Sequence, residues 1–436
     1  MDFSKILENK PLLYGIIGGV ALIIVLVIVG AIFAANIFLA RTFTQETFGL
    51  ISFAYLTALN LGGFASSGMA QTSSKVIGNS IRDNPKNIDL SIGVVLRVGF
   101  WLILFVSFLV AAGSDVLSHA LDKESNQEEL SVLLKIAAGI LFFTAAANVL
   151  QNTLFVLDQY KSAAFISVVS CILMLSMLAV ALSSNSSKFS LIALGLASLI
   201  QFFGEIFFLR KFYKNQNYAK AQLVDKRKVR AALFKFLKPA LLVSVIGAPI
   251  HWACMTMLAR GENGMEQLAF FNAAFQFYLI VLFFPSAIGN MSISIFSKTK
   301  LGASTKKVFI GAIGLVFLAG LFVGAPLAVF LEVATYFYGA SYASIEPVIK
   351  TLAIAAVIAG VSISLQQYLA AQSFAWINFG TASLYSVFYL ALTFLFVNNS
   401  LGAKGVADAI LISACVQVLL QLAVLFFINR KSGFCT

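Results

Sequence analysis

Apolar segments long enough to cross a membrane follow one another along almost the whole chain. A transmembrane helix needs about 20 mainly apolar residues. Every backbone polar group inside the bilayer must be satisfied within the protein, so an open chain crosses as helices. The alternating pattern of membrane β-strands is absent from this sequence. The predicted spans are Leu12–Ala40, Phe48–Ala70, Leu90–Gly113, Leu130–Phe155, Ala163–Leu182, Phe189–Leu209, Pro239–Leu258, Gln267–Ser294, Val308–Leu331, Pro347–Ala371, Trp376–Val397 and Gly405–Ile428.

The composition excludes an ordinary water-soluble protein. Hydrophobic residues make up 60% of the chain and charged residues only 11%, whereas a soluble domain carries about 25% charged residues. The net charge of +12 would suggest nucleic-acid binding in a soluble protein, but here the bases occupy short segments between apolar runs. We therefore predict an all-α polytopic membrane protein with about twelve transmembrane helices and no nucleic-acid partner.

The sequence contains no recognisable catalytic or cofactor-binding motif. The four cysteines form neither a CxxC pair nor a metal-ligand spacing, and no zinc-protease, phosphate-loop or dinucleotide fingerprint occurs. The longest loop predicted on the outer side, Ser114–Glu129, is short and acidic. We expect no metal, no cofactor and no enzymatic activity. The first span is too long for a cleaved signal peptide and is expected to persist as a helix.

The distribution of bases predicts the orientation in the membrane. If the N-terminus is cytoplasmic, most of the 30 Lys and Arg residues fall on the inner side, including the dense run Arg210–Lys238. Acids such as Asp115 and Glu128 collect on the opposite side. Cytoplasmic loops are enriched in bases, so we predict that both termini are cytoplasmic.

The chain resembles itself at a spacing of about half its length. The segment Leu39–Ile77 and the segment Leu258–Phe296 each end an apolar run with Leu-Ala-Arg, pass a polar turn and begin another apolar run. Arg41 and Arg260 lie 219 positions apart, and half of the 436 residues is 218. A looser match relates the sequence around Lys135 to that around Lys350. Such repeats favour a duplicated architecture.

The duplication predicts two parallel six-helix lobes around a central cavity, because an even number of spans leaves both halves in the same orientation. We predict an N-terminal lobe over 1–209, a basic cytoplasmic linker over 210–238 and a C-terminal lobe over 239–436 with a short cytoplasmic tail. Within the linker, Val229, Leu233, Phe236 and Leu237 share one helical face. That face suits an amphipathic helix on an anionic leaflet, and a plain solvated linker is the alternative.

Basic residues within or near the spans are candidates for binding an anionic substrate. Arg97 lies inside the third span, where a charge costs several kcal/mol unless it faces water or reaches the headgroups. Lys135 and Lys350 lie inside the outer ends of the fourth and tenth spans, and Arg41 and Arg260 end the first and seventh. A cavity lined by bases would favour phosphate or carboxylate groups. Anchoring at the membrane interface is the alternative for each residue.

Uncharged polar residues are candidates for lining the same cavity. Asn60, Ser67 and Gln71 follow helical spacing in an unusually polar second span, and Gln151 corresponds to Gln366 in the second half. Close helix packing is the alternative function of such residues.

Two further residues are candidates for ion coupling. Glu205 lies near the inner end of the sixth span, and His251 lies in the seventh span after a proline. The alternatives are a local ion pair for Glu205 and a buried, hydrogen-bonded side chain for His251.

The run from Leu39-Ala-Arg41 through Phe48-Gly49-Leu50, with the polar second span, resembles the N-terminal signature of the polysaccharide transporter family. This family includes the Wzx-type O-antigen flippases and belongs to the multidrug/oligosaccharidyl-lipid/polysaccharide exporter superfamily. Phe270-Phe271-Asn272-Ala273-Ala274 is similar to the corresponding element of the family's second lobe.

The resemblance implies a flippase that moves an undecaprenyl-diphosphate-linked oligosaccharide across a bacterial inner membrane, with membrane lipids and a glycan polymerase complex as potential partners. Two alternatives remain open. A cation-coupled exporter of small molecules would usually need an acid in an N-lobe helix, and the first span has none. A membrane-embedded glycan polymerase would need a larger outer loop.

Overall fold

The computed structural model describes residues 27–83, 88–121, 126–215, 223–296, 303–329, 332–371 and 374–432. Helices and short turns account for all of these residues, and no strand occurs among them. The predicted all-α class is therefore confirmed. The first half of the predicted span Leu12–Ala40 lies outside the described residues.

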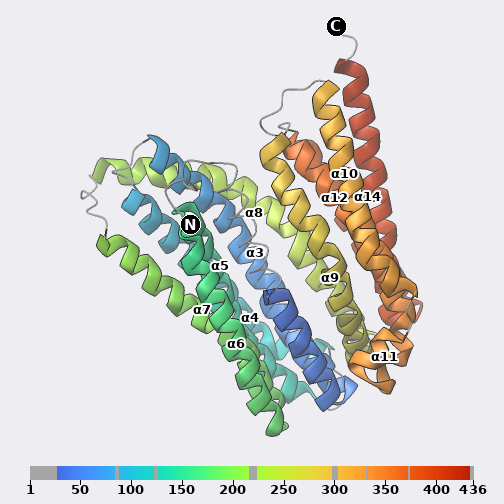
Figure 1. Cartoon of the computed structure of the whole chain (residues 1–436). Coiled ribbons are helices and arrows are strands. Elements are labelled where there is room, and N and C mark those ends of the chain that lie inside the picture. Colours follow the sequence, from blue (N-terminus) through green and yellow to red (C-terminus); the bar gives the residue numbers. More distant parts are fainter. Residues whose placement is uncertain are drawn as a thin grey trace, which may run out of the picture. The chain divides into compact units, whose positions relative to one another are not determined.

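The helices follow one another with short connections (Figure 1). After a helix over Val27–Thr42 come α3 (Gln45–Asp83), α4 (Ile88–Leu121), α5 (Gln127–Val156), α6 (Tyr160–Ser183), α7 (Ser187–Asn215), α8 (Leu223–Arg260), α9 (Gly264–Phe296), α10 (Ala303–Val329), α11 (Val333–Tyr338), the 3₁₀ helix η2 (Ala340–Ile345), α12 (Glu346–Ala371), α13 (Ala375–Asn398) and α14 (Gly402–Ser432).

Ten helices in the described residues have the length and hydropathy to cross a membrane, and two shorter apolar helices cover Val27–Thr42 and Ile313–Leu327. This agrees with the predicted number of about twelve spans. Several helices continue beyond the predicted apolar segments. For example, α3 extends to Asp83, because polar residues outside the hydrocarbon layer can continue the backbone hydrogen bonds that the apolar turns began.

The chain forms two compact units. Unit 1 comprises Met1–Thr42 and Leu50–Trp252, and unit 2 comprises Phe43–Gly49 and Ala253–Thr436. Two helices are therefore divided: the first turn of α3 belongs to unit 2, and most of α8 belongs to unit 1. The predicted division into 1–209, 210–238 and 239–436 stays a prediction.

Each unit is built around one central helix. In unit 1, α5 packs against α4, α6 and α7, and in unit 2, α12 packs against α9, α10, α13 and α14. These two helices carry Lys135 and Lys350, the anchors of the looser sequence match. The stronger match has the same local structure in both copies: Leu39 and Leu258 are buried, whereas Arg41 and Arg260 are exposed at helix ends.

The predicted linker contains the end of α7 and the first turns of α8. Three residues of its predicted apolar face, Val229, Leu233 and Leu237, are buried within the protein, and the side chain of Phe236 lies outside the described residues. The expectation of a separate surface helix resting on lipid is therefore wrong for this face. The apolar face of an amphipathic helix can be buried against other parts of the protein instead of lipid.

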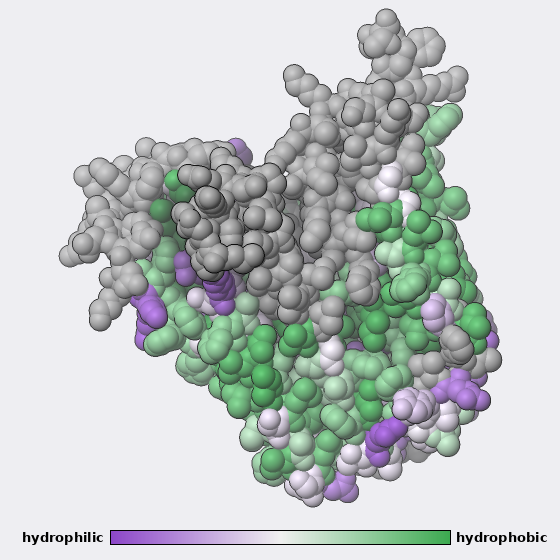
Figure 2. All heavy atoms as spheres, viewed as in Figure 1, coloured by the Kyte–Doolittle hydropathy of each residue, from purple (hydrophilic) through white to green (hydrophobic). Residues whose placement is uncertain are grey.

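Large apolar side chains are exposed along the outer helices. They include Trp101, Phe108, Phe189, Phe322 and Phe427. On the face that Figure 2 shows, apolar residues cover most of the coloured area and hydrophilic residues form small patches. A soluble monomer rarely exposes apolar patches larger than a few hundred Å², so lipid is the solvent of this surface.

Candidate functional site

Polar side chains follow one face of the central helix of unit 1. Thr144, Asn148 and Gln151 on α5 are spaced by four and three residues, which places them on one side of the helix. Their hydrogen-bond partners are Ser198 on α7, Ser66 on α3 and Ser167 on α6. We call these six residues, together with Gln201 and Glu205 of α7, the polar core of unit 1.

The contacts in the polar core differ in length. The hydroxyl oxygens of Thr144 and Ser198 are 2.6 Å apart, and the amide of Gln151 donates to the hydroxyl of Ser167 over 3.2 Å. Both distances are typical of hydrogen bonds. Each pair joins α5 to a different helix, so the polar core fixes the packing of the unit. Gln151, predicted as a cavity residue, takes part in this packing.

Glu205 is the charged member of the polar core. Its side chain is fully buried on α7, and its Oε1 accepts a hydrogen bond from Nε2 of Gln201 over 3.2 Å. Its Oε2 is buried without a hydrogen-bond partner among the described residues. Arg210 and Lys211, the expected local ion-pair partners, make no salt bridge with it in the described structure. A buried carboxylate without compensation is costly, so this position is suited to a group that changes its protonation state.

The polar residues of the second predicted span lie on α3. Asn60 and Ser67 are half-buried, and the amide of Asn60 donates to the carbonyl of Leu56 within its own helix. The side chain of Gln71 lies outside the described residues. Gly68 allows α3 to approach α8 closely, because a Cβ there would lie 2.9 Å from a methyl group of Leu241.

His251 is half-buried on α8. The neighbouring Trp252 donates from its indole nitrogen to the hydroxyl oxygen of Thr57 on α3 over 3.0 Å. This contact lies within unit 1, and it ties α8 to α3 beside the predicted coupling histidine.

Unit 2 has a smaller polar cluster between α12 and α14. The hydroxyl of Ser362 donates to Oε1 of Gln421 over 3.1 Å, and Nε2 of Gln366 donates to Ser362 over 3.3 Å. Ser362 and Gln421 are buried, while Gln366 is half-buried. The predicted cavity residue Gln366 therefore bonds within its own helix to Ser362, the residue whose hydroxyl joins α12 to α14.

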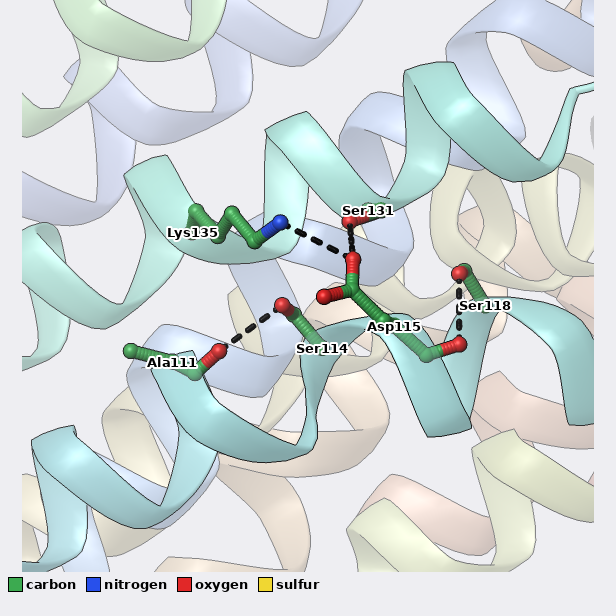
Figure 3. Close-up of polar contacts among 6 residues, drawn as sticks. All are labelled: Ala111, Ser114, Asp115, Ser118, Ser131 and Lys135. Atoms are coloured by element: carbon green, nitrogen blue, oxygen red, sulfur yellow. Dashed lines mark hydrogen bonds and ion pairs between the residues drawn. The ribbon is translucent and has the colours of Figure 1, made fainter.

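Lys135 has an acidic partner that the sequence analysis missed. Its Nζ lies 2.9 Å from Oδ1 of Asp115, and the hydroxyl of Ser131 bonds to the same carboxylate oxygen (Figure 3). Asp115 is near the end of α4 and Lys135 near the start of α5, so the pair joins the two arms of a helical hairpin. Both side chains are about half exposed or more, at 61% and 48%. The charge of Lys135 is therefore largely neutralised by its neighbour.

Arg97 lies on an exposed face of α4. One turn later on the same face come Trp101 and then Leu104 and Phe108, with exposed fractions of 63%, 37% and 64%. A basic residue at the end of an exposed apolar stripe resembles a lipid-facing side chain that reaches toward the headgroups. This placement favours the anchoring alternative for Arg97.

The remaining bases lie at helix ends. Arg41 and Arg260 are exposed, whereas Lys350 is half-buried in the first turns of α12. Lys350 has no ion pair or hydrogen bond among the residues that the structure describes. Among the five candidate bases it alone is half-buried, so its charge is the one least solvated by water. Among the described residues, no group of His, Cys, Asp and Glu side chains is suited to hold a metal ion.

The helical units define the class of protein. A multidrug resistance MATE family transporter of the MOP superfamily, solved in an inward-facing conformation, matches with a TM-score of 0.72 at 14% identity, over 92% of this chain and 95% of that chain. Lipid II flippase MurJ, in an inward closed conformation, matches with a TM-score of 0.73 at 15% identity, over 92% and 86%. The chain has the fold of the MOP superfamily transporters.

Two proteins with similar sequences define the family of this chain within that fold. The EPS I polysaccharide export inner membrane protein EpsE of Ralstonia solanacearum is 31% identical over 399 residues, which cover 90% of this chain and 89% of the relative. The protein of the same name from Ralstonia nicotianae is 29% identical over 397 residues, with the same coverage. No protein-family model matches. The chain belongs to the family of these polysaccharide export proteins, which confirms the resemblance in the sequence, and it is a multi-pass protein of the bacterial inner membrane.

Proposed function

We propose that the protein is a flippase that moves an undecaprenyl-diphosphate-linked oligosaccharide, a repeat unit of O-antigen or a similar polysaccharide, from the inner to the outer leaflet of the inner membrane. The observation that carries the proposal is the 31% identity, over 90% of the chain, to a polysaccharide export inner membrane protein. The shared fold with a Lipid II flippase supports it. Alternating access between the two lobes is the proposed mechanism.

Lys350 is the first residue that we assign to the diphosphate. A half-buried ammonium that has no partner among the described residues can form charge-assisted hydrogen bonds to phosphate oxygens. Arg41 and Arg260 are proposed as further contacts at helix ends, and Arg97 as an attractive charge for the phosphate at the inner surface. Asn60 and Ser67 are proposed to bind glycan hydroxyls, since the other described candidates, Gln151 and Gln366, already bond to serines of their own units.

Replacing Lys350 tests this assignment. We expect Lys350→Ala to lower export at an unchanged protein level, and Lys350→Arg to keep most of the activity because the charge remains. Lys188→Ala is the matched control, because Lys188 is an exposed base at the start of α7. Equal activity of the Lys350→Ala and Lys188→Ala proteins would remove Lys350 from the binding site.

We propose that Glu205 takes up and releases the coupling ion, with His251 as the second candidate. The support is a fully buried carboxyl whose Oε2 has no described partner. Glu205→Gln keeps the size and the contact with Gln201 but cannot ionise. Transport by this variant should lose its dependence on a proton or sodium gradient while the protein remains folded. Unchanged gradient dependence would exclude Glu205 from coupling.

The same buried carboxyl favours one alternative, a cation-coupled exporter of small molecules with the same fold. A leaflet assay separates the two functions. The gene is deleted, and labelled lipid-linked glycan is followed across the leaflets of membrane vesicles. Accumulation on the cytoplasmic face, reversed by the intact protein, supports the flippase. A normal distribution, together with gradient-driven efflux of small molecules, supports the exporter.

A further inference from the structure

A slot of about 310 Å³ runs along the side of unit 1. The helices α4 and α7 form its walls and α5 forms its floor, because α5 packs against both. Ile103 of α4, Val149 and Leu150 of α5, and Ile206 and Leu209 of α7 give the slot an apolar lining. Its volume corresponds to about ten water-sized groups at roughly 30 Å³ each, which suits one narrow hydrocarbon chain.

The two ends of the slot differ in chemistry. At one end, Phe142 of α5 bridges Phe100 of α4 and Phe202 of α7, with ring centroids 5.6 and 6.3 Å away. At the other end, Arg210 and Tyr213 of α7 line the slot. Phe202 and Arg210 are eight residues apart, about 12 Å along a helix. One leaflet of the hydrocarbon core is about 15 Å thick, so the slot is about one leaflet deep.

Arg210 gives the slot a charge preference. Its side chain is exposed and has no ion pair or hydrogen bond among the described residues. A guanidinium matches the geometry of a phosphate, and tyrosine is enriched at the level of the lipid headgroups. An apolar chain in the slot would place its headgroup beside these two residues.

We propose that this slot binds one acyl chain of an anionic phospholipid from the adjacent leaflet, with the phosphate held by Arg210. The occupant is a phospholipid because the slot takes a single chain of leaflet depth and ends at an uncompensated cation. A zwitterionic lipid would gain less from Arg210, since its own cation competes. The proposal is independent of the transported substrate, because the slot lies within one unit and needs no change of access.

The test counts lipids on the full-length protein. The protein is reconstituted in bilayer discs of phosphatidylglycerol and phosphatidylcholine, released into the gas phase, and its retained lipids are counted by native mass spectrometry. We expect selective retention of phosphatidylglycerol. Arg210→Ala should weaken retention about tenfold or more, as expected for a charged hydrogen bond of about 1.5–3 kcal/mol, whereas Arg210→Lys should weaken it less. Lys211→Ala, the adjacent exposed base outside the slot, should change it less than twofold.

A second pair of variants tests the apolar part. Ala146→Leu fills the floor of the slot and should reduce retention, whereas Ala112→Leu on the exposed face of α4 should not. Monodisperse, helical protein is required of each variant, and Arg210→Lys serves if Arg210→Ala fails to fold. Equal losses for Arg210→Ala and Lys211→Ala, full retention by Ala146→Leu, or equal retention of the two phospholipids would overturn the proposal. Recovery of a polyprenyl phosphate in the slot instead of phospholipid would also overturn it.

Discussion

Adding a single methyl group at Gly49, by Gly49→Ala, should lower the stability of the protein measurably. Gly49 lies in the first turns of α3, in the part that belongs to unit 2. A Cβ on Gly49 would lie 2.7 Å from the carbonyl carbon of Met265 and 3.2 Å from its Cα, both at the start of α9. Carbon atoms pack at about 3.5–4.0 Å, and the carbonyl oxygen of Met265 would be nearer still, so the two backbones would have to separate by at least about 0.8 Å.

The neighbouring contacts leave little freedom for this movement. Phe48 is fully buried and its ring packs edge-on against Tyr342, and Gln45 donates to the carbonyl of Ser341 over 2.7 Å. Overpacking of this kind costs about 1–3 kcal/mol. At about 2–4 °C per kcal/mol for a domain of 150–250 residues, the apparent Tm of Gly49→Ala should lie about 2–12 °C below that of a Gly→Ala variant on the same helix that causes no clash.

Thermal unfolding of the purified protein measures this effect. Gly78→Ala is the matched control, because Gly78 lies on the same helix and a Cβ added there would have no atom within 4 Å. Alanine has the better helix propensity by about 1 kcal/mol, so the control should be neutral or more stable. A Tm for Gly49→Ala equal to that of Gly78→Ala would refute the close approach of α3 and α9.

Three further substitutions test individual contacts. Thr57→Val removes the acceptor for Trp252 and should cost about 0.6–1.7 kcal/mol, the range for hydrogen bonds between membrane helices; Thr57→Ser should restore most of the stability in thermal unfolding. A double-mutant cycle on Asp115 and Lys135 should give a coupling below about 1 kcal/mol, because the pair is exposed, and a larger value would contradict this. Gly402→Ala should lower the free energy of unfolding by at least about 1 kcal/mol, because φ at Gly402 is +50°. Denaturation measures this loss, with a Gly→Ala variant at a glycine of negative φ as the control.

The helices were predictable because one free-energy contribution dominates. Burial of about 20 apolar residues in lipid outweighs local propensity, so the number and order of the spans follow from hydropathy alone. The helix ends were not predictable in the same way. The basic segment before Pro239 has the charge of a surface linker, yet it forms the first turns of α8 and its apolar side chains are buried. Which neighbouring element covers these side chains depends on the tertiary packing.

The partner of Lys135 could have been predicted. Asp115 lies two residues beyond the third predicted span and Lys135 five residues into the fourth, so both lie near the same end of a helical hairpin, where an acid and a base can pair. The orientation of Arg97 was harder to predict. Both sides of α4 are mainly apolar, and the main sequence signal that distinguishes them is its four serines, all of which are buried.

The two units resemble each other in packing more closely than in polar chemistry, and this difference locates the ionisable interior. The central helices α5 and α12 occupy corresponding roles, and each contributes a glutamine that bonds to a buried serine. Among the Asp, Glu, Lys and Arg side chains whose burial the structure describes, Glu205 of unit 1 alone is buried. The described cluster of unit 2 consists of the hydroxyl of Ser362 and two amides, which do not change charge in water. Of these two described polar clusters, only that of unit 1 therefore contains a group that can gain or lose a proton.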